Sequence, residues 1–176
     1  ARMRRLDEDA EITIFERGEY VSFANCGLPY HIGETIEDRD ELLLQTPEEF
    51  LERFRIAVHT NAEVTAVDTE RKGVTVGAGD DAREVPYDYL VLSPGAKPVR
   101  PPIPGSDSPS IMSLRTLPDM DAIKARVDRD NSARAVVVGG GFIGLEMAEN
   151  LRERGLSVTL VEQAEQVFLA ADPEMT

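Results

Sequence analysis

The feature that most constrains the fold is a glycine-rich segment, Gly139-Gly140-Gly141-Phe142-Ile143-Gly144, which fits the pattern G-x-G-x-x-G. It lies between a continuous apolar run and an amphipathic stretch, a setting in which this pattern predicts a strand, a tight turn and a helix. Gly139 then permits the turn, Gly141 lets the backbone approach a pyrophosphate, and Gly144 allows the helix to pack closely on the strand. The segment therefore predicts a dinucleotide site with its phosphates at the helix N-terminus. A glycine-rich turn without a ligand is the alternative.

An acidic residue further along the chain supports this site. Glu162 closes the predicted strand 157–161 and stands 23 residues after Gly139. A carboxylate at that place accepts hydrogen bonds from the ribose hydroxyls of an adenosine and repels a 2′-phosphate. The pattern favours NADH over NADPH, unless Glu162 is no more than an exposed strand end.

Glu16 repeats this pattern in the first part of the chain. It closes a β-branched and aromatic run, 11–16, that predicts a short buried strand, and residues 1–6 are typical of the last turns of a helix. The βαβ order then makes Glu16 the ribose carboxylate of a first dinucleotide site, whose glycine loop we expect to lie before Ala1. A surface charge at a strand end would give the same pattern.

The rest of the chain has two parts with different predicted elements, separated by a proline-rich segment. Residues 46–54 predict a helix capped by Thr46 and Glu49, and 56–92 predict short strands that end in a buried strand, 90–92. Six of the 11 prolines fall within 94–109 and mark a stiff connector. A helix over 119–127 and the start of another at 171–176 are predicted after it.

This order of elements predicts an α/β fold with two Rossmann-like, three-layer nucleotide-binding domains, both incomplete in this chain. Residues 1–108 would form an FAD-type domain without its first strand and glycine loop. Residues 109–176 would form the first βαβ part of an NAD(P)H domain.

Composition narrows the classes of partner. Asp and Glu number 33 against 19 Lys and Arg, which gives a formal charge of −14. This balance argues against a nucleic acid or an anionic membrane surface as partner. No apolar run approaches the roughly 20 residues of a membrane span. No Cys and His cluster has metal-ligand spacing, so no metal is predicted. Because the sequence shows no membrane span and has one cysteine, a cytoplasmic location is expected.

The chain has one cysteine, Cys26, within the segment Ser22-Phe23-Ala24-Asn25-Cys26-Gly27-Leu28-Pro29-Tyr30. A lone cysteine is most often a small apolar core residue. Here Ser22 and Asn25 place polar groups beside it, which favours a reactive thiol. Without a second cysteine, that thiol would pair with a sulfur from outside the chain or cycle through a sulfenic acid.

Four segments, in chain order, carry a resemblance to a known family. They are Glu16-Arg17, the cysteine segment 22–30, the run Tyr87-Asp88-Tyr89-Leu90-Val91-Leu92-Ser93-Pro94-Gly95-Ala96, and the glycine-rich segment 139–144. With them the chain resembles the single-cysteine group of the FAD-dependent pyridine nucleotide-disulfide oxidoreductases. Within that group it is similar to the coenzyme A-disulfide reductases and the NADH-dependent CoA-persulfide (polysulfide) reductases. The resemblance covers nearly the whole chain, and the cysteine segment is its most specific part.

The resemblance implies an activity and its partners. NADH would reduce FAD, and the electrons would reach a mixed disulfide between Cys26 and coenzyme A, with release of CoA thiolate. The substrate would be a small-molecule disulfide or persulfide. The resemblance also implies a homodimer, formed through a C-terminal domain that this chain does not contain.

The resemblance implies site residues position by position. Cys26 is the redox nucleophile, while Ser22, Asn25 and Arg5 lie at the substrate, with Arg5 near the CoA phosphates. Glu146 is expected close to the nicotinamide and Val64 beside the adenine of FAD. The cofactor-binding positions are Glu16, Arg17, Val64, Ser93, Pro94, Gly95, Gly139, Gly141, Ile143, Gly144, Glu146 and Glu162.

Some positions depart from the family pattern. A basic residue that some members use for coenzyme A aligns with Phe54, and the first glycine motif, the later Gly-Asp motif for FAD and the dimer domain are not in this chain. We therefore expect the 176 residues alone to be inactive.

Two alternative functions fit the same residues. One is a water-forming NADH oxidase or peroxidase that uses a sulfenic acid at Cys26, and the other is a non-catalytic dinucleotide-binding module. His31, five residues beyond Cys26, is expected to be structural.

Overall fold

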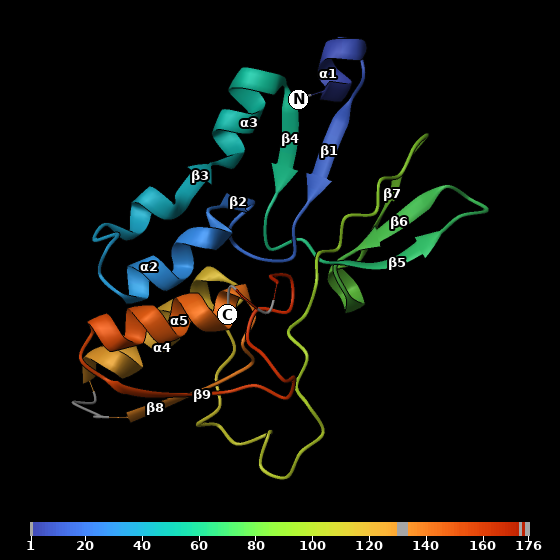
Figure 1. Cartoon of the computed structure of the whole chain (residues 1–176). Helices are drawn as coiled ribbons and strands as arrows, with labels where there is room; N and C mark the ends of the chain where they lie inside the picture. Colours follow the sequence, from blue (N-terminus) through green and yellow to red (C-terminus); the bar gives the residue numbers. More distant parts are fainter. Residues whose placement is uncertain (1, 130–133, 173, 175–176) are drawn as a thin grey trace. The chain divides into compact units, whose positions relative to one another are not determined.

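The computed structural model describes residues 2–129, 134–172 and 174, and the chain divides into two compact units (Figure 1). The first unit consists of Ala1–Phe23 with Leu43–Gly95, and the second of Ala24–Leu42 with Ala96–Thr176. The cysteine turn therefore belongs to the same unit as the glycine-rich segment. The predicted division into an FAD-type domain, 1–108, and an NAD(P)H-type domain, 109–176, is based on which nucleotide each part would bind. It stays a prediction.

In the first unit, two parallel strands hold the N-terminal part together. Strand β1 (Ile12–Phe15) pairs in parallel with β4 (Ile56–His59), so that Phe15 lies opposite His59 with their rings stacked 5.3 Å apart. Helix α1 (Arg2–Leu6) precedes β1, and α3 (Pro47–Phe54) precedes β4. Arg4 joins the two, because its Nε donates to Phe54 O at 2.9 Å and its Nη2 donates to Arg55 O at 2.8 Å.

Two antiparallel sheets complete the first unit. Strand β2 (Ser22–Phe23) pairs with β3 (Leu43–Gln45), and β5 (Val64–Asp68), β6 (Gly73–Val76) and β7 (Arg83–Pro86) form a second sheet in that order. A short 3-10 helix, η3 (Gly79–Asp81), lies between β6 and β7. Helix α3 begins as predicted, because Glu49 N donates to Thr46 Oγ1 while Thr46 N donates to Glu49 Oε2.

The second unit contains the predicted βαβ element. Strands β8 (Arg134–Val138) and β9 (Ser157–Val161) pair in parallel, and α5 (Phe142–Glu153) connects them. Helix α4 (Leu117–Arg129) precedes β8. The inserted segment supplies η1 (Asn25–Gly27), α2 (Leu28–Ile32) and η2 (Arg39–Leu42), and α2 packs against both α4 and α5. The buried apolar core of this unit consists of Leu28, Ile32, Leu42, Leu117, Met120, Met147 and Leu151.

A buried amide lies where α2 ends against α5. Asn150 is 1% exposed, and its Nδ2 donates to Glu146 O at 2.8 Å. Its side chain is so close to Gly33 that a Cβ on Gly33 would collide with the amide oxygen. The backbone of Gly33 is right-handed, with φ of −73°, so glycine is required there for space rather than for conformation.

Arg154 adds a charged connection between the same elements. Its Nη1 donates to Ile32 O at 2.8 Å, at the end of α2, and its Nη2 donates to Asp128 Oδ1 at 2.6 Å, on α4. Glu34 and Lys124 extend this network, since Lys124 Nζ lies 3.1 Å from Glu34 Oε1. The cysteine turn is thereby fixed, through α2, to the helix that follows the glycine-rich loop.

One predicted strand is wrong. Residues 90–92 have no regular secondary structure, and Val91 and Leu92 are 73% and 71% exposed. A buried strand needs a hydrogen-bonded neighbour and cover on both faces, and within 2–129, 134–172 and 174 nothing pairs with this run. Of the helix start predicted at 171–176, residues 173, 175 and 176 lie outside the described part. Among the described helices, none is long and apolar enough to cross a membrane.

Candidate functional site

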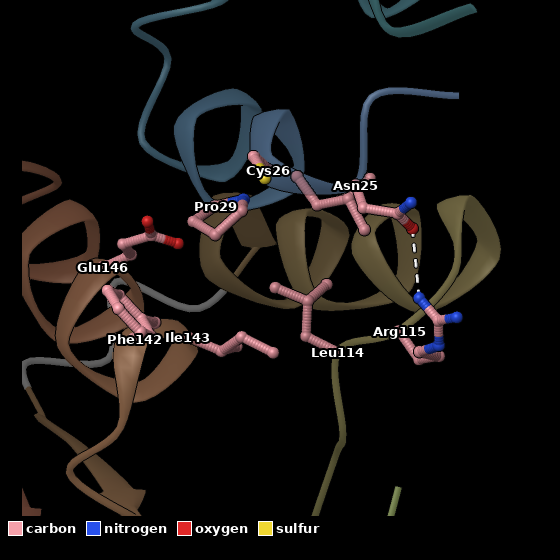
Figure 2. Close-up of a pocket in the computed structure, with 9 residues that line it drawn as sticks. Asn25, Cys26, Pro29, Leu114, Arg115, Phe142, Ile143 and Glu146 are labelled. Carbon is pink, nitrogen blue, oxygen red and sulfur yellow. Dashed lines mark hydrogen bonds between the residues drawn. The ribbon is translucent and has the colours of Figure 1, made fainter. Parts of the chain in front are cut away.

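A pocket of about 410 Å³ lies beside Cys26 in the second unit (Figure 2). Its walls come from the cysteine turn, the segment before α4 and the first turns of α5. Cys26 is an exposed residue and belongs to the wall of this pocket. The lining residues are Asn25, Cys26, Leu28, Pro29, Leu114, Arg115, Phe142, Ile143 and Glu146.

Local backbone contacts fix the turn that carries Cys26. Ala24 N donates to Leu42 O at 2.8 Å, and Gly27 N donates to Ala24 O at 2.9 Å. A Cβ on Gly27 would run into the buried side chain of Leu42, so a larger residue here would require Leu42 to move. The next residues, Leu28 and Pro29, are buried and hold the turn against the core. The turn that carries Cys26 is therefore held in place on both sides of the cysteine.

Arg115 is a pocket residue that the sequence analysis missed. Its Nη1 donates to Asn25 Oδ1 at 3.1 Å, the contact drawn as a dashed line in Figure 2. The backbone of Arg115 is fixed at the start of α4, where Arg115 N and Thr116 N both donate to Asp119 Oδ2. The pattern Thr116-x-x-Asp119 signals a helix start, but nothing in it indicates a contact with a residue 90 positions away.

The glycine-rich loop has the geometry that its pattern predicts. Gly139 has φ of +105°, in the left-handed region, and its N donates to Val161 O at 2.8 Å. A Cβ on Gly144 would collide with the carbonyl oxygen of Gly139, whereas a Cβ on Gly141 would meet nothing within 4 Å. No side chain caps α5 at Gly141, so the first N–H groups of this helix remain for a ligand. The tight turn at Gly139, the close packing at Gly144 and the open space beside Gly141 are together the geometry of a pyrophosphate-binding loop.

Glu162 is tied to this loop. Its Oε1 accepts a hydrogen bond from Ala164 N at 2.8 Å, and its Oε2 accepts one from Gly140 N at 2.6 Å. These backbone donors, Ala164 first and then Gly140, hold the pKa of the Glu162 carboxyl below its ordinary value. The carboxylate is therefore ionised at neutral pH, and each oxygen keeps acceptor capacity for a further donor such as a ribose hydroxyl.

Two phenylalanines that were not predicted connect the loop with the pocket. Phe142 and Phe168 pack edge to face with ring centroids 4.4 Å apart, and Phe168 N donates to Gly140 O at 2.7 Å. Phe142 also lines the Cys26 pocket. The ring of Phe142 thus contributes both to the segment that covers the loop and to the wall of the pocket.

In the first unit, three of the predicted cofactor positions lie close together. Gly18 N donates to Glu16 Oε1 at 2.6 Å, and Ala62 N donates to the carbonyl of Glu16 at 2.9 Å. Segment 61–64 therefore runs beside 16–18, which brings Val64 into the neighbourhood of Glu16 and Arg17. Arg17 Nη1 lies 4.0 Å from Glu63 Oε1.

The other predicted residues are placed as follows. Arg5 is exposed on α1, and Ser22 is paired with Gln45 in the sheet formed by β2 and β3. His31 is buried with its Nδ1 2.8 Å from Ile36 O, a structural contact. Asn25, Cys26, Ile143 and Glu146 share the pocket, while Gly139, Gly141, Gly144 and Glu162 form the loop. Ser93, Pro94 and Gly95 are exposed and irregular.

The whole chain, residues 1–176, matches the family described as pyridine nucleotide-disulphide oxidoreductase. A coenzyme A disulfide reductase of Staphylococcus haemolyticus (strain JCSC1435) is 44% identical over 177 residues. That match covers 99% of this chain and 40% of the relative, so the chain spans two fifths of the relative's length.

Solved structures agree with this assignment. Reduced Bacillus anthracis CoADR-RHD has a TM-score of 0.94 and 50% identity, covering 99% of this chain and 32% of that protein. A NAD-dependent persulfide reductase from A. fulgidus has a TM-score of 0.92 and 37% identity, covering 98% of this chain and 32% of that protein. The predicted Rossmann-type α/β fold is confirmed, and the chain belongs to the pyridine nucleotide-disulphide oxidoreductase family.

Proposed function

We propose that this chain is part of a flavin-dependent oxidoreductase that passes electrons from NADH through FAD to Cys26, which reduces a CoA-disulfide, a CoA-persulfide or polysulfide. The observation that carries the proposal is the pocket that Cys26 shares with Phe142, Ile143 and Glu146. These three residues lie on α5, the helix that begins at the glycine-rich loop. Relatives named for CoA disulfide and persulfide reduction support the same chemistry.

NADH is assigned to the second unit. The uncapped N–H groups at the start of α5 would bind its pyrophosphate, and the ionised carboxylate of Glu162 would accept hydrogen bonds from the ribose. The same negative charge repels the 2′-phosphate of NADPH, which is the reason for preferring NADH. Glu146, in the wall of the cysteine pocket, would lie close to the nicotinamide.

FAD is assigned to the residues of the first unit that the family resemblance marks. The Glu16 carboxylate, already bound to one backbone N–H, fits a ribose, and the neighbouring segment with Val64 fits an adenine. Arg17 and the turn Ser93-Pro94-Gly95 complete the set. When bound, FAD supplies two-electron transfer between the nicotinamide and sulfur.

Cys26 carries the sulfur chemistry. Its thiolate attacks one sulfur of CoA-disulfide, the S–S bond of the substrate breaks, and one CoA thiolate leaves with the electron pair. The new bond joins Cys26 Sγ to the remaining CoA sulfur. Two electrons from NADH then cleave this mixed disulfide, which regenerates the Cys26 thiolate and releases the second CoA. Ser22 and Asn25 would contact the substrate sulfur region, and Arg5 would contact the CoA phosphates.

The cellular setting and the assembly are also part of the proposal. A thiol that must return to its reduced form suits the reducing cytoplasm. A homodimer is expected from the family resemblance alone.

The test is anaerobic NADH oxidation by the holoenzyme that contains this chain. CoA-disulfide, CoA-persulfide and polysulfide are supplied in turn as acceptors to the parent and to Cys26→Ser. We expect acceptor-dependent turnover in the parent and none in the variant, because serine cannot form the mixed disulfide. Glu165→Gln, which changes an exposed carboxylate, serves as the control and should keep the parent rate.

Oxygen alone is the second arm of this test. Turnover with oxygen and no response to the CoA acceptors would overturn the proposal in favour of an oxidase. If neither the parent nor Cys26→Ser oxidises NADH with any of these acceptors, the result would point instead to a non-catalytic dinucleotide-binding module.

A further inference from the structure

Two packed helices contribute separate walls of the Cys26 pocket. Figure 2 shows Cys26 and Pro29 on the cysteine turn and α2, and Phe142, Ile143 and Glu146 on α5. Helices α2 and α5 belong to the same compact unit and pack against each other. The distance between these two walls therefore depends on how closely α2 approaches α5.

One contact limits this approach. Gly33 caps the C-terminal end of α2 and lies against Asn150, one helical turn beyond Glu146 on α5. A Cβ on Gly33 would collide with Asn150 Oδ1 and would lie 2.7 Å from its Cγ and 2.9 Å from its Cβ. Rotation of the Asn150 side chain moves the first two atoms but not the Cβ. A side chain at position 33 would therefore push α2 away from α5.

The amide of Asn150 is itself held in place. The residue is 1% exposed, and its Nδ2 donates to Glu146 O at 2.8 Å. Among the residues that the structure describes, its buried Oδ1 has no hydrogen-bond donor. Burying an acceptor without a donor costs free energy, so this amide calls for a role other than stability. Its position suggests one, because it connects the backbone of Glu146 with the end of α2.

On the basis of the proposed function, we propose that Asn150 is a positioning residue for the chemistry of Cys26. Through its contact with Gly33 it sets the distance between the cysteine turn and the wall that carries Glu146. This distance matters because the thiol and its substrate must meet in a fixed geometry within the pocket. Glu146 also makes the distance measurable, since it is the only carboxylate among the described residues that line the pocket and it repels an approaching anion.

The experiment uses Gly33→Ala in the holoenzyme that contains this chain. Gly33 has φ of −73°, which alanine adopts freely, so the substitution adds only a methyl group. The holoenzyme is reduced with dithiothreitol and desalted, and Cys26 is then alkylated by iodoacetate, an anion, or by neutral iodoacetamide of similar size. The ratio of the two rate constants, iodoacetate over iodoacetamide, should rise about twofold in Gly33→Ala, because repulsion by Glu146 weakens as the walls separate.

Turnover supplies the second readout. The kcat for NADH-dependent reduction of CoA-disulfide should fall about tenfold in Gly33→Ala, because the thiol is displaced from its working geometry. The KM for NADH should stay within about twofold, since the substitution leaves the glycine-rich loop unchanged.

Matched variants separate positioning from general damage. Asn150→Gly removes all three atoms that a methyl group at position 33 would meet, so adding Gly33→Ala to it should leave the alkylation ratio unchanged. Adding Gly33→Ala to Glu146→Gln should also leave the ratio unchanged, because the repelling charge is gone. Gly73→Ala on β6 is the control and should behave as the parent, since the nearest atom to its Cβ is Val85 O at 3.9 Å. Circular dichroism and flavin content show that each variant has folded.

Four results overturn the inference. The first is a parent ratio in Gly33→Ala, and the second is a rise in the ratio that persists in the Glu146→Gln background. The third is a rise that persists in the Asn150→Gly background, and the fourth is a changed ratio with the parent kcat. A parent holoenzyme that reduces no disulfide with NADH would overturn the proposed function, whereas the alkylation ratios test the distance between the walls without any turnover.

Discussion

At the scale of single residues, the carboxylate of Glu162 organises the backbone of the proposed dinucleotide site. Its two oxygens accept from Ala164 N and Gly140 N, which fixes the strand end and the glycine-rich loop relative to each other. The sequence predicted the residue and its place from spacing alone. The sequence did not predict these hydrogen bonds to Gly140 and Ala164. The spacing between the glycines and the acidic residue indicates only that the carboxylate would bind a ribose, and not which protein groups it contacts.

Glu162→Gln is expected to weaken NADH binding. A glutamine keeps one acceptor oxygen and turns an NH2 group toward a backbone N–H, so one of the two hydrogen bonds is lost. The KM for NADH should rise about tenfold, and the ratio of kcat/KM for NADPH to that for NADH should increase because the negative charge is gone. Steady-state kinetics with both nucleotides measure this. Glu165→Gln is the control, and an unchanged ratio in Glu162→Gln would contradict the assignment of this residue.

Asp128 gives a prediction about pH. The hydrogen bond from Arg154 is the main cause that holds the pKa of Asp128 below its ordinary value; burial opposes it, and Lys124 adds to it. A carboxyl with a lowered folded pKa stabilises the protein fully above its unfolded pKa of about 3.9, and the contribution disappears as the pH falls through the folded pKa. Asp128→Asn should therefore unfold at lower urea than the parent at pH 7, and the difference should shrink below about pH 4. Asp80→Asn, an exposed change, should unfold at the same urea concentration as the parent at both pH values. If Asp128→Asn remained less stable than the parent by the same amount in acid, the result would argue against this ion pair.

At the scale of elements, the position of the cysteine turn depends on how α2 meets α4 and α5. Helix α2 has five residues, too short to be stable alone, so its neighbours must hold it. Helical spacing predicted α4 and α5, and the cap pattern of Thr46 and Glu49 predicted α3, because such signals lie within a few residues of one another. The contact of Arg154 with Ile32 spans 122 positions and that of Arg115 with Asn25 spans 90, and no local signal reports such pairs.

Arg154→Met should destabilise this part of the protein. The side chain of Arg154 is 16% exposed and satisfies both the Ile32 carbonyl and the Asp128 carboxylate. Its removal leaves the partly buried Ile32 carbonyl without this donor and breaks the exposed ion pair with Asp128, and it should cost about 1–2 kcal/mol in free energy of unfolding. Urea titration of the holoenzyme measures the loss. Arg152→Met removes an exposed arginine of the same helix and should change the value by less than about 0.5 kcal/mol; equal losses in the two variants would exclude this role for Arg154.

At the scale of the whole molecule, the pattern of strands was predicted only in part. The βαβ element was predicted correctly because its strands and helix are consecutive in the chain. The run 90–92 was predicted as a buried strand from its apolar residues, but a strand also requires a pairing partner, which composition does not reveal. The residues around Cys26 were predicted from the family resemblance, whereas Leu114, Arg115 and Phe142 entered the pocket through tertiary packing.

The formal charge of −14 predicts how this 176-residue chain responds to salt. An excess of carboxylates repels itself most strongly in the compact state, and added ions screen that repulsion. Raising NaCl from about 0.05 M to about 0.5 M should therefore raise Tm by a few degrees. Thermal unfolding monitored by circular dichroism measures it. A fall in Tm would mean that ion pairs such as those of Arg154 outweigh the overall repulsion.

The contact between Gly33 and Asn150 constrains how the two positions change during evolution. The missing side chain on one residue is the space that the amide of the other occupies, so neither position varies independently. A lineage that acquires a larger residue at position 33 must first replace Asn150 by a residue with a shorter side chain. Otherwise the packing of α2 against α5 is lost until the second substitution occurs. Glycine and asparagine at these two positions are therefore expected to be inherited together and replaced together.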